Sequence, residues 1–212
     1  LHYTFDNNTL DHSDAEGSFQ DASVVGNVNH AEGRNTANQG AYQFQDNGYL
    51  NVSSVSLNSN PFSVCLWALP ESFEESRMDL LNTGNSGLKL GYKENGEKIF
   101  FNENNVPTNN QYGLKEWSHL CVTYDGSSKL ELYANGEALK YVQESITLGT
   151  FSLQIGASYD GSNNWNGRID DFKLFDRKLA GDEIFDLYFE ESRDLEGFFP
   201  LAGNAIDHSG HQ

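Results

Sequence analysis

Apolar and polar residues alternate along much of the chain, in short segments that recur about every ten residues. Side chains of a β-strand point alternately to opposite faces of a sheet, so this alternation predicts strands. The pattern and its spacing are typical of an all-β, antiparallel two-sheet sandwich. The clearest segments are residues 41–44, 62–67, 119–124 and 130–133.

Tight turns separate several of these segments. Gly, Asn, Asp and Ser dominate the connections, whereas the chain has only 4 prolines. Asn-Gly and Asp-Gly pairs favour the positive φ angles that short hairpin turns require, and they occur at Asn95-Gly96, Asp125-Gly126 and Asn135-Gly136. These turns predict hairpins within residues 88–101 and 118–141.

One segment near the C-terminus, residues 180–189, has helical periodicity instead. Asp182 and Glu183 favour the positive end of a helix dipole, and Ile184, Leu187 and Tyr188 fall on one face. We expect this helix to pack on the sandwich near its end.

The last residues of the chain resemble its first ones. Residues 198–211 read FFPLAGNAIDHSGH and align without gaps to the N-terminal residues, so that Asp207-His208-Ser209 matches Asp11-His12-Ser13. Such repetition is typical of tandem modules. We therefore interpret residues 1–192 as one module, and residues 193–212 as a linker plus the beginning of a second copy, which makes a neighbouring tandem domain a partner. The alternative is that this tail adds a strand to the module's own sheet.

Composition and charge narrow the class of protein. The 212 residues are 37% hydrophobic and 13% aromatic, which is enough for one well-buried core. No segment approaches the roughly 18 apolar residues that a membrane span needs, so we expect no membrane insertion. The formal net charge of -18 repels phosphate backbones and anionic lipids, which makes nucleic acid a poor partner and divalent cations more natural ones. The alternative is a solvated acidic surface without a dedicated metal site, because the carboxylates are dispersed along the chain.

A series of motifs over roughly residues 1–190 resembles the laminin G-like, concanavalin A-like jelly-roll superfamily in order and spacing. The resemblance implies a two-sheet antiparallel jelly-roll sandwich with one short C-terminal helix. It also implies a binding or adhesive module of secreted or cell-surface proteins, often holding calcium and frequently next to enzymatic domains. The motifs are LHYTFDNNTLDHS, AYQFQDNGYLNV, NPFSVCLWALP, EWSHLCVTYDGSSKLELYANGEAL, SLQIGAS and NGRIDDFKLFDRKLAGDEI.

The chain has two cysteines, Cys65 and Cys121, each in the centre of a predicted strand. Pentraxins, a calcium-dependent branch of the same fold, resemble this chain in placing a cysteine within each corresponding strand, which implies a Cys65–Cys121 disulfide. The alternative is two free buried cysteines, because Cys behaves as a small hydrophobic residue in cores. A disulfide would indicate an oxidising compartment, and with it an extracellular or cell-surface location.

Strand alternation predicts that Asp170 lies on the same face as Phe172 and Leu174, toward the core. A buried carboxylate needs a partner, which could be backbone N–H groups, an arginine or a calcium ion. The resemblance implies that the first and last strands lie close together, so we expect Asp6, Asp11 and Asp170 as candidate calcium ligands. The alternative for Asp6 and Asp11 is capping of their own turns.

Residues 158–166, SYDGSNNWN, are the most ligand-like surface in the sequence. Tyr159 and Trp165 offer flat faces for a sugar ring, while Asp160, Asn163 and Asn164 offer hydrogen bonds or metal oxygens. The alternative for Trp165 is that it folds back onto the edge of the sandwich, since exposed aromatic rings are costly unless something covers them. Of the acidic and amide cluster that pentraxins present here for calcium, only Asp160 matches.

The sequence contains no recognisable catalytic constellation. The paired-carboxylate strand of jelly-roll glucanases is missing, and so are HExxH, GxSxG and phosphate-binding glycine loops. We therefore expect a non-catalytic module that recognises a glycan or glycoprotein, with calcium as its candidate cofactor. The alternatives are a structural spacer in a cell-surface stalk and a glycoside hydrolase.

Overall fold

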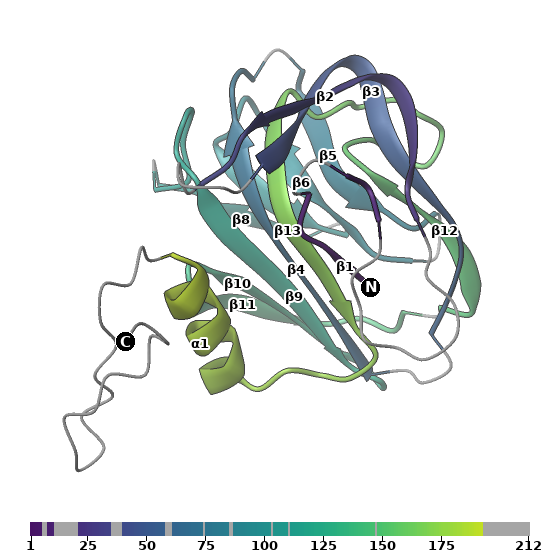
Figure 1. The fold of residues 1–212 in the computed structure, drawn as a ribbon. Helices are drawn as coiled ribbons and strands as arrows, with labels where there is room; N and C mark the ends of the chain where they lie inside the picture. The colour runs from purple at the N-terminus through teal and green to yellow at the C-terminus, as the bar shows by residue number, and fades with distance from the viewer. Residues whose placement is uncertain are drawn as a thin grey trace, which may run out of the picture.

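The computed structural model describes residues 1–5, 8–10, 21–34, 40–57, 61–73, 75–84, 87–102, 104–109, 111–146 and 148–192. This part of the chain forms antiparallel strands that fold over into a sandwich, with one helix on its outside, as Figure 1 shows. The predicted all-β class is confirmed. The strands are β1 (His2–Tyr3), β2 (Ser23–Glu32), β3 (Gly40–Ser56), β4 (Pro61–Pro70), β5 (Arg77–Asn82), β6 (Lys89–Lys93), β7 (Lys98–Phe101), β8 (Asn104–Pro107), β9 (Ser118–Asp125), β10 (Lys129–Ala134), β11 (Glu137–Gln143), β12 (Thr150–Ile155) and β13 (Gly167–Phe175).

The four segments with the clearest alternation lie in β3, β4, β9 and β10. Both predicted hairpin regions are present: β6 pairs with β7, and β9, β10 and β11 form a meander. The turn residues Asn95 and Asn135 have φ angles of 55° and 49°, which is the left-handed conformation that the hairpin turns require.

The long strand β3 joins the two layers of the sandwich. Its first half pairs with β13 and its second half with β12, so the strand order runs β11-β10-β9-β4-β13-β3-β12-β5-β6-β7-β8. The two ends of this order meet again, because Lys140 Nζ on β11 donates a hydrogen bond to the Asn105 carbonyl oxygen on β8 at 3.0 Å. The sandwich is therefore nearly a closed barrel.

The interior between the layers is apolar, as alternation requires when one face of each strand is buried. It is filled by aliphatic and aromatic side chains. Its fully buried members include Phe44, Leu50, Leu66, Leu90, Phe101, Leu120, Val122, Leu132, Ile155 and Phe172.

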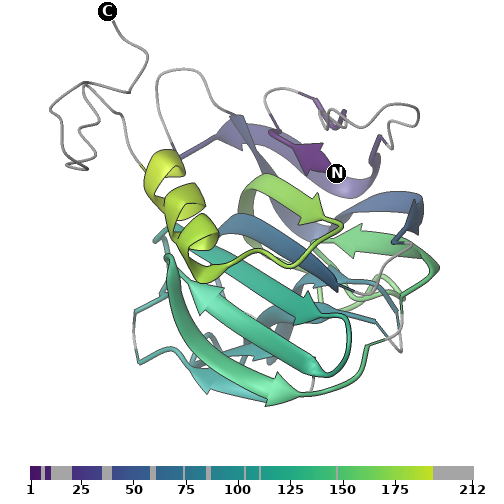
Figure 2. The same ribbon diagram turned by 90° about the horizontal axis from the view of Figure 1, so that it is seen from below.

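Helix α1 (Gly181–Glu191) confirms the predicted helix and covers the outer face of β4, β9 and β10 (Figure 2). Its N-terminus is closed by Glu183, whose carboxylate accepts a hydrogen bond from the Ala180 backbone N–H at 2.8 Å. Ile184, together with Leu179 just before the helix, packs against the two cysteines.

The prediction that Asp170 shares a face with Phe172 is wrong, because a β-bulge interrupts the alternation in β13. Asp171 has a φ of 45°, and the register with β4 shifts between Asp170 and Lys173. Phe172 packs in the core between the layers, whereas Asp170 lies opposite Trp67 on the outer face. An extra residue in one strand reverses the face of every residue after it.

Candidate functional site

The loop of residues 156–166 joins β12 to β13 and folds against β5. Three backbone hydrogen bonds fix its path: Gly156 N to Leu80 O at 2.9 Å, Asp79 N to Asn163 O at 2.9 Å, and Trp165 N to Gly156 O at 2.8 Å. The second of these places the middle of the loop beside Asp79. The loop is therefore built onto the sheet.

Asp79 anchors this loop from below the surface. Its side chain is fully buried, and Arg77 binds both carboxylate oxygens, with Nε at 2.6 Å and Nη2 at 2.8 Å. Asn82 Nδ2 and Ser158 Oγ donate further bonds to Asp79 at 2.9 Å and 2.8 Å, and Asn163 Nδ2 donates to Ser158 Oγ at 2.9 Å. A buried charge satisfied in this way holds the loop residues in one geometry.

Two surface hollows lie on either side of the loop and share Asp160, Ser162 and Asn163. The larger, about 630 Å³, is bounded across from the loop by Asp46 and Glu75. The smaller, about 320 Å³, is bounded by Lys89 and Tyr159, among others. The loop is thus a polar ridge between two concave surfaces.

Tyr159 and Asp160 are exposed on the ridge, as the sequence predicts, and so is Ser162. Tyr159 is 53% exposed, and a Cβ added at Gly84 would lie 3.6 Å from its ring, so the ring stands beside Gly84. Asp160 Oδ1 accepts hydrogen bonds from Ser162 Oγ at 2.6 Å and Ser162 N at 3.1 Å. These bonds lower the pKa of Asp160, so its carboxylate is charged at neutral pH.

Trp165 does not offer a ring face at the surface. It is fully buried and its ring centroid lies 5.6 Å from that of Tyr92 in the core. This is the alternative in which Trp165 folds back onto the sandwich, so the expectation of a second exposed aromatic platform is corrected. Asn163 takes part in the anchor, and Asn164 is partly buried beside the larger hollow.

Asp170, on β13, lies in a network of charges on the outer face of the sheet. Arg34 Nε approaches Asp170 Oδ2 at 3.4 Å, and the same guanidinium binds the Asp171 carboxylate. Burial, and next the neighbouring charge of Asp171, raise the pKa of Asp170 to about 7, although Arg34 opposes that rise.

The calcium prediction stays a prediction. Asp6 and Asp11 lie outside the described residues, as does the proposed second copy at 193–212. For Asp170, the described residues provide the arginine partner that was the alternative to calcium.

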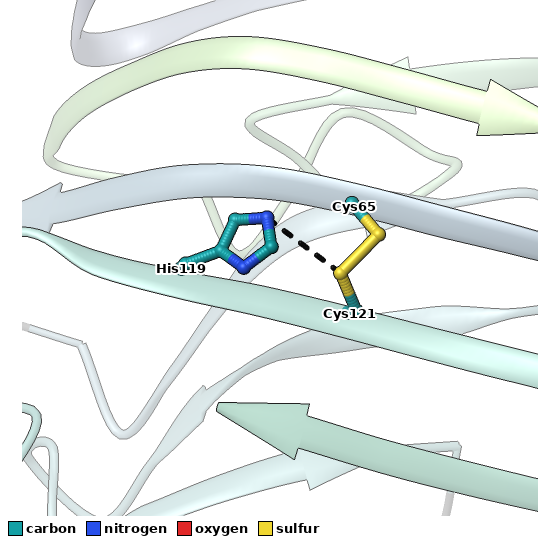
Figure 3. Close-up of side chains that lie close together, drawn as sticks. All are labelled: Cys65, His119 and Cys121. Atoms are coloured by element: carbon teal, nitrogen blue, oxygen red, sulfur yellow. Dashed lines mark hydrogen bonds between the residues drawn. A yellow bond between two sulfur atoms is a disulfide. The ribbon is translucent and has the colours of Figure 1, made fainter. Parts of the chain in front are cut away.

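The disulfide between Cys65 and Cys121 is present and links β4 to β9 at directly opposed positions. His119 lies beside it, with Nε2 3.7 Å from Cys121 Sγ (Figure 3). Burial first, and then the nearby charges of Lys173 and Arg34, lower the pKa of His119 to about 3, so its ring is neutral. Within the described ranges, the one group of three Cys, His, Asp or Glu side chains whose ligand atoms all lie within 4.8 Å of one another is Cys65, His119 and Cys121.

Sequence reasoning missed Asp79 and Arg77. The available signal was a single acidic residue inside the otherwise apolar segment Met78-Asp79-Leu80-Leu81, which a buried strand tolerates only with a partner.

Comparison with known proteins places the chain in a family. Residues 44–185 match the model of the concanavalin A-like lectin/glucanases superfamily. The chain belongs to this superfamily. A pentraxin-related protein of Mus musculus, PTX3, is 33% identical over 97 residues, which cover 39% of this chain and 25% of that protein.

Solved structures with low sequence identity share the fold of this superfamily member. Domain 4 of AbnA, a GH43 extracellular arabinanase from Geobacillus stearothermophilus solved in complex with arabinotriose, superposes with a TM-score of 0.68 at 20% identity, over 88% of this chain and 96% of that one. A structure of botulinum neurotoxin type C, whose cell entry depends on interaction with two ganglioside molecules, superposes with a TM-score of 0.58 at 19% identity, over 85% of this chain and 50% of that one.

Within the residues that the structure describes, no helix is long and apolar enough to cross a membrane.

Proposed function

We propose that this domain is a non-catalytic carbohydrate-binding module and that its binding site is the ridge of residues 158–164 with the hollows beside it. The observation that carries the proposal is Tyr159: an aromatic ring 53% exposed, on a loop fixed by a buried anchor, with hydrogen-bonding groups on both sides. Sugar rings stack on exposed aromatic faces while their hydroxyls bond to carboxylates and amides.

The polar groups around Tyr159 suit the hydroxyls of an uncharged glycan. Asp160 Oδ1 accepts hydrogen bonds from Ser162, and because the side chain is exposed its carboxylate can also accept hydrogen bonds from sugar hydroxyls. Asp46 and Glu75 add two carboxylates on the far side of the larger hollow. These charges, on a chain with a net charge of -18, disfavour acidic sugars at the same surface.

The family relationship supports the same proposal. The superposed domain 4 of the arabinanase is in complex with arabinotriose, an uncharged sugar. The disulfide and the pentraxin relative support an extracellular or cell-surface location, with a glycan or glycoprotein as partner.

The test is a glycan array followed by calorimetric titration of the best ligand. Tyr159→Ala is expected to weaken binding about fivefold or more, since loss of a stacked ring costs about 1–3 kcal/mol. Tyr141→Ala is the matched control, because Tyr141 is also exposed, at 62%, but lies on β11 away from the loop. Absence of binding to every glycan would instead favour the structural spacer. Equal losses of glycan affinity in Tyr159→Ala and Tyr141→Ala would mean that the binding site is not on the ridge.

A further inference from the structure

Three side chains that play no part in the proposed binding site converge beneath helix α1. Cys65, His119 and Cys121 are at most 1% exposed, and their ligand atoms all lie within 4.8 Å of one another. Figure 3 shows the imidazole of His119 directed at the sulfur of Cys121, with both on β9 and Cys65 facing them from β4. Cysteine sulfur and imidazole nitrogen are the protein ligands that Zn²⁺ prefers.

The β-ladder holds these three residues together independently of the S–S bond. Cys65 is the cross-strand partner of Cys121, and Trp67 is the partner of His119. Both pairs belong to one unbroken antiparallel register, in which Pro61 pairs with Asp125 at one end and Ala68 with Ser118 at the other. Helix α1 covers this face, since Leu179 and Ile184 pack on the two cysteines. The side chains therefore stay adjacent as long as β4 and β9 stay paired, whether or not the sulfurs are bonded.

We propose that reduction of the disulfide converts Cys65, Cys121 and His119 into a binding site for a thiophilic divalent cation such as Zn²⁺. A dithiol reductant supplies two electrons and two protons and becomes a cyclic disulfide, while the Cys65–Cys121 bond breaks to give two thiols. The cation then displaces both thiol protons to solvent and is bound by two thiolates and by the unprotonated Nε2 of His119. In the oxidised protein the sulfurs are bonded to each other, so this thiolate site does not exist.

The surroundings supply a candidate fourth ligand. Glu191, at the end of α1, has Oε2 3.9 Å from His119 Nε2, and it is fixed by a 2.6 Å hydrogen bond from Trp67 Nε1 and by an ion pair with Lys173. Two thiolates, one imidazole and one carboxylate oxygen make up the tetrahedral set that zinc requires. The site would tie the C-terminal end of α1 to β9.

The test compares the oxidised protein with protein reduced by a dithiol and freed of it by anaerobic gel filtration. Equilibrium dialysis against Zn²⁺ should give one bound ion per reduced chain and none per oxidised chain. With Co²⁺ in place of Zn²⁺, absorption bands of tetrahedral thiolate coordination should appear only in the reduced sample.

Two variants separate this site from adventitious binding. His119→Phe, in the reduced state, should bind the ion at least about tenfold more weakly, whereas His30→Phe on β2 should bind as the unaltered protein does. Equal uptake by the oxidised and reduced proteins, or an unchanged affinity in His119→Phe, overturns the proposal. If reduction unfolds the chain, near-ultraviolet circular dichroism should show that Zn²⁺ restores the fold, and a chain that stays unfolded in Zn²⁺ also overturns it.

Discussion

Two buried aspartates in this domain have the same side chain and different partners. Asp79, beneath the ridge of residues 158–164, faces an arginine fork, an amide and a hydroxyl that all donate to its carboxylate. Asp170, on the outer face, shares one guanidinium with Asp171 and accepts backbone N–H bonds from Asp171 at 2.8 Å and from Arg34 at 3.5 Å. Its pKa is raised to about 7, by burial first and next by the charge of Asp171. The two carboxylates therefore differ in their neighbours: Asp79 has one arginine bound to both of its oxygens, whereas Asp170 shares its arginine with a second carboxylate.

The two aspartates also hold different parts of the molecule in place. The donors of Asp79 include Ser158, so its charge determines the shape of a loop that reaches solvent. The network of Asp170 instead extends through Arg34 and Lys173 to Glu191, and so it joins the sheet to α1. Asp79 thus positions a surface loop, and the network around Asp170 attaches helix α1 to the sheet.

The largest expected effect comes from removing the Asp79 carboxylate. Asp79→Ala leaves Arg77 without its fork partner and removes the bond to Ser158, so the free energy of unfolding should fall by roughly 3–5 kcal/mol. Urea unfolding followed by fluorescence measures this change. Asp46→Ala is the control, since Asp46 is an exposed residue of the same hollow, and an equally large loss there would mean that Asp79 is no special anchor.

An intermediate effect is expected at Asp170, and it depends on pH. A carboxyl whose pKa is raised in the folded state to about 7 binds its proton more tightly when folded. It therefore stabilises the folded state fully below about pH 4, and this stabilisation is lost as the pH rises from about 4 through 7. Asp170→Asn cannot ionise, so its stability relative to the unaltered protein should increase between pH 5 and pH 8, by roughly 1–3 kcal/mol. A difference that is constant with pH contradicts the raised pKa.

The smallest expected effect is that of calcium. If Asp6, Asp11 and Asp170 bind the ion, it must compete with Arg34 for Asp170, so weak binding is expected. At about ten times the dissociation constant, mass action adds about 1.4 kcal/mol to the stability. Thermal melts with calcium and with chelator measure the shift, which Asp11→Asn should abolish; identical melts would remove the calcium prediction.

The sequence predicts the fold well because its signals are local. Alternation in residues 119–124 and the positive φ of Asn135 depend only on neighbours along the chain, and both are found as predicted. The motif resemblance is confirmed by the family to which the chain belongs and by the disulfide.

The candidate site was predicted only in part because its decisive contacts are not local. Trp165 is buried against Tyr92, and Asp79 meets Ser158 79 residues later in the chain, and neither pairing leaves a local pattern. The bulge at Asp171 is a further limit, since one residue with positive φ reverses the alternation on which the position of Asp170 was predicted.

The hydrogen bonds of Asp79 reach some residues of the loop and leave others at the surface. The anchor reaches the loop through Ser158 and Asn163 and bypasses Tyr159 and Asp160, which stand at the surface. Substitutions at positions 159 and 160 can therefore exchange the contact surface without dismantling the frame that displays it. The residues that would contact a ligand can thus change while the loop keeps its structure. A combinatorial library restricted to those two positions should yield folded domains with new ligand preferences.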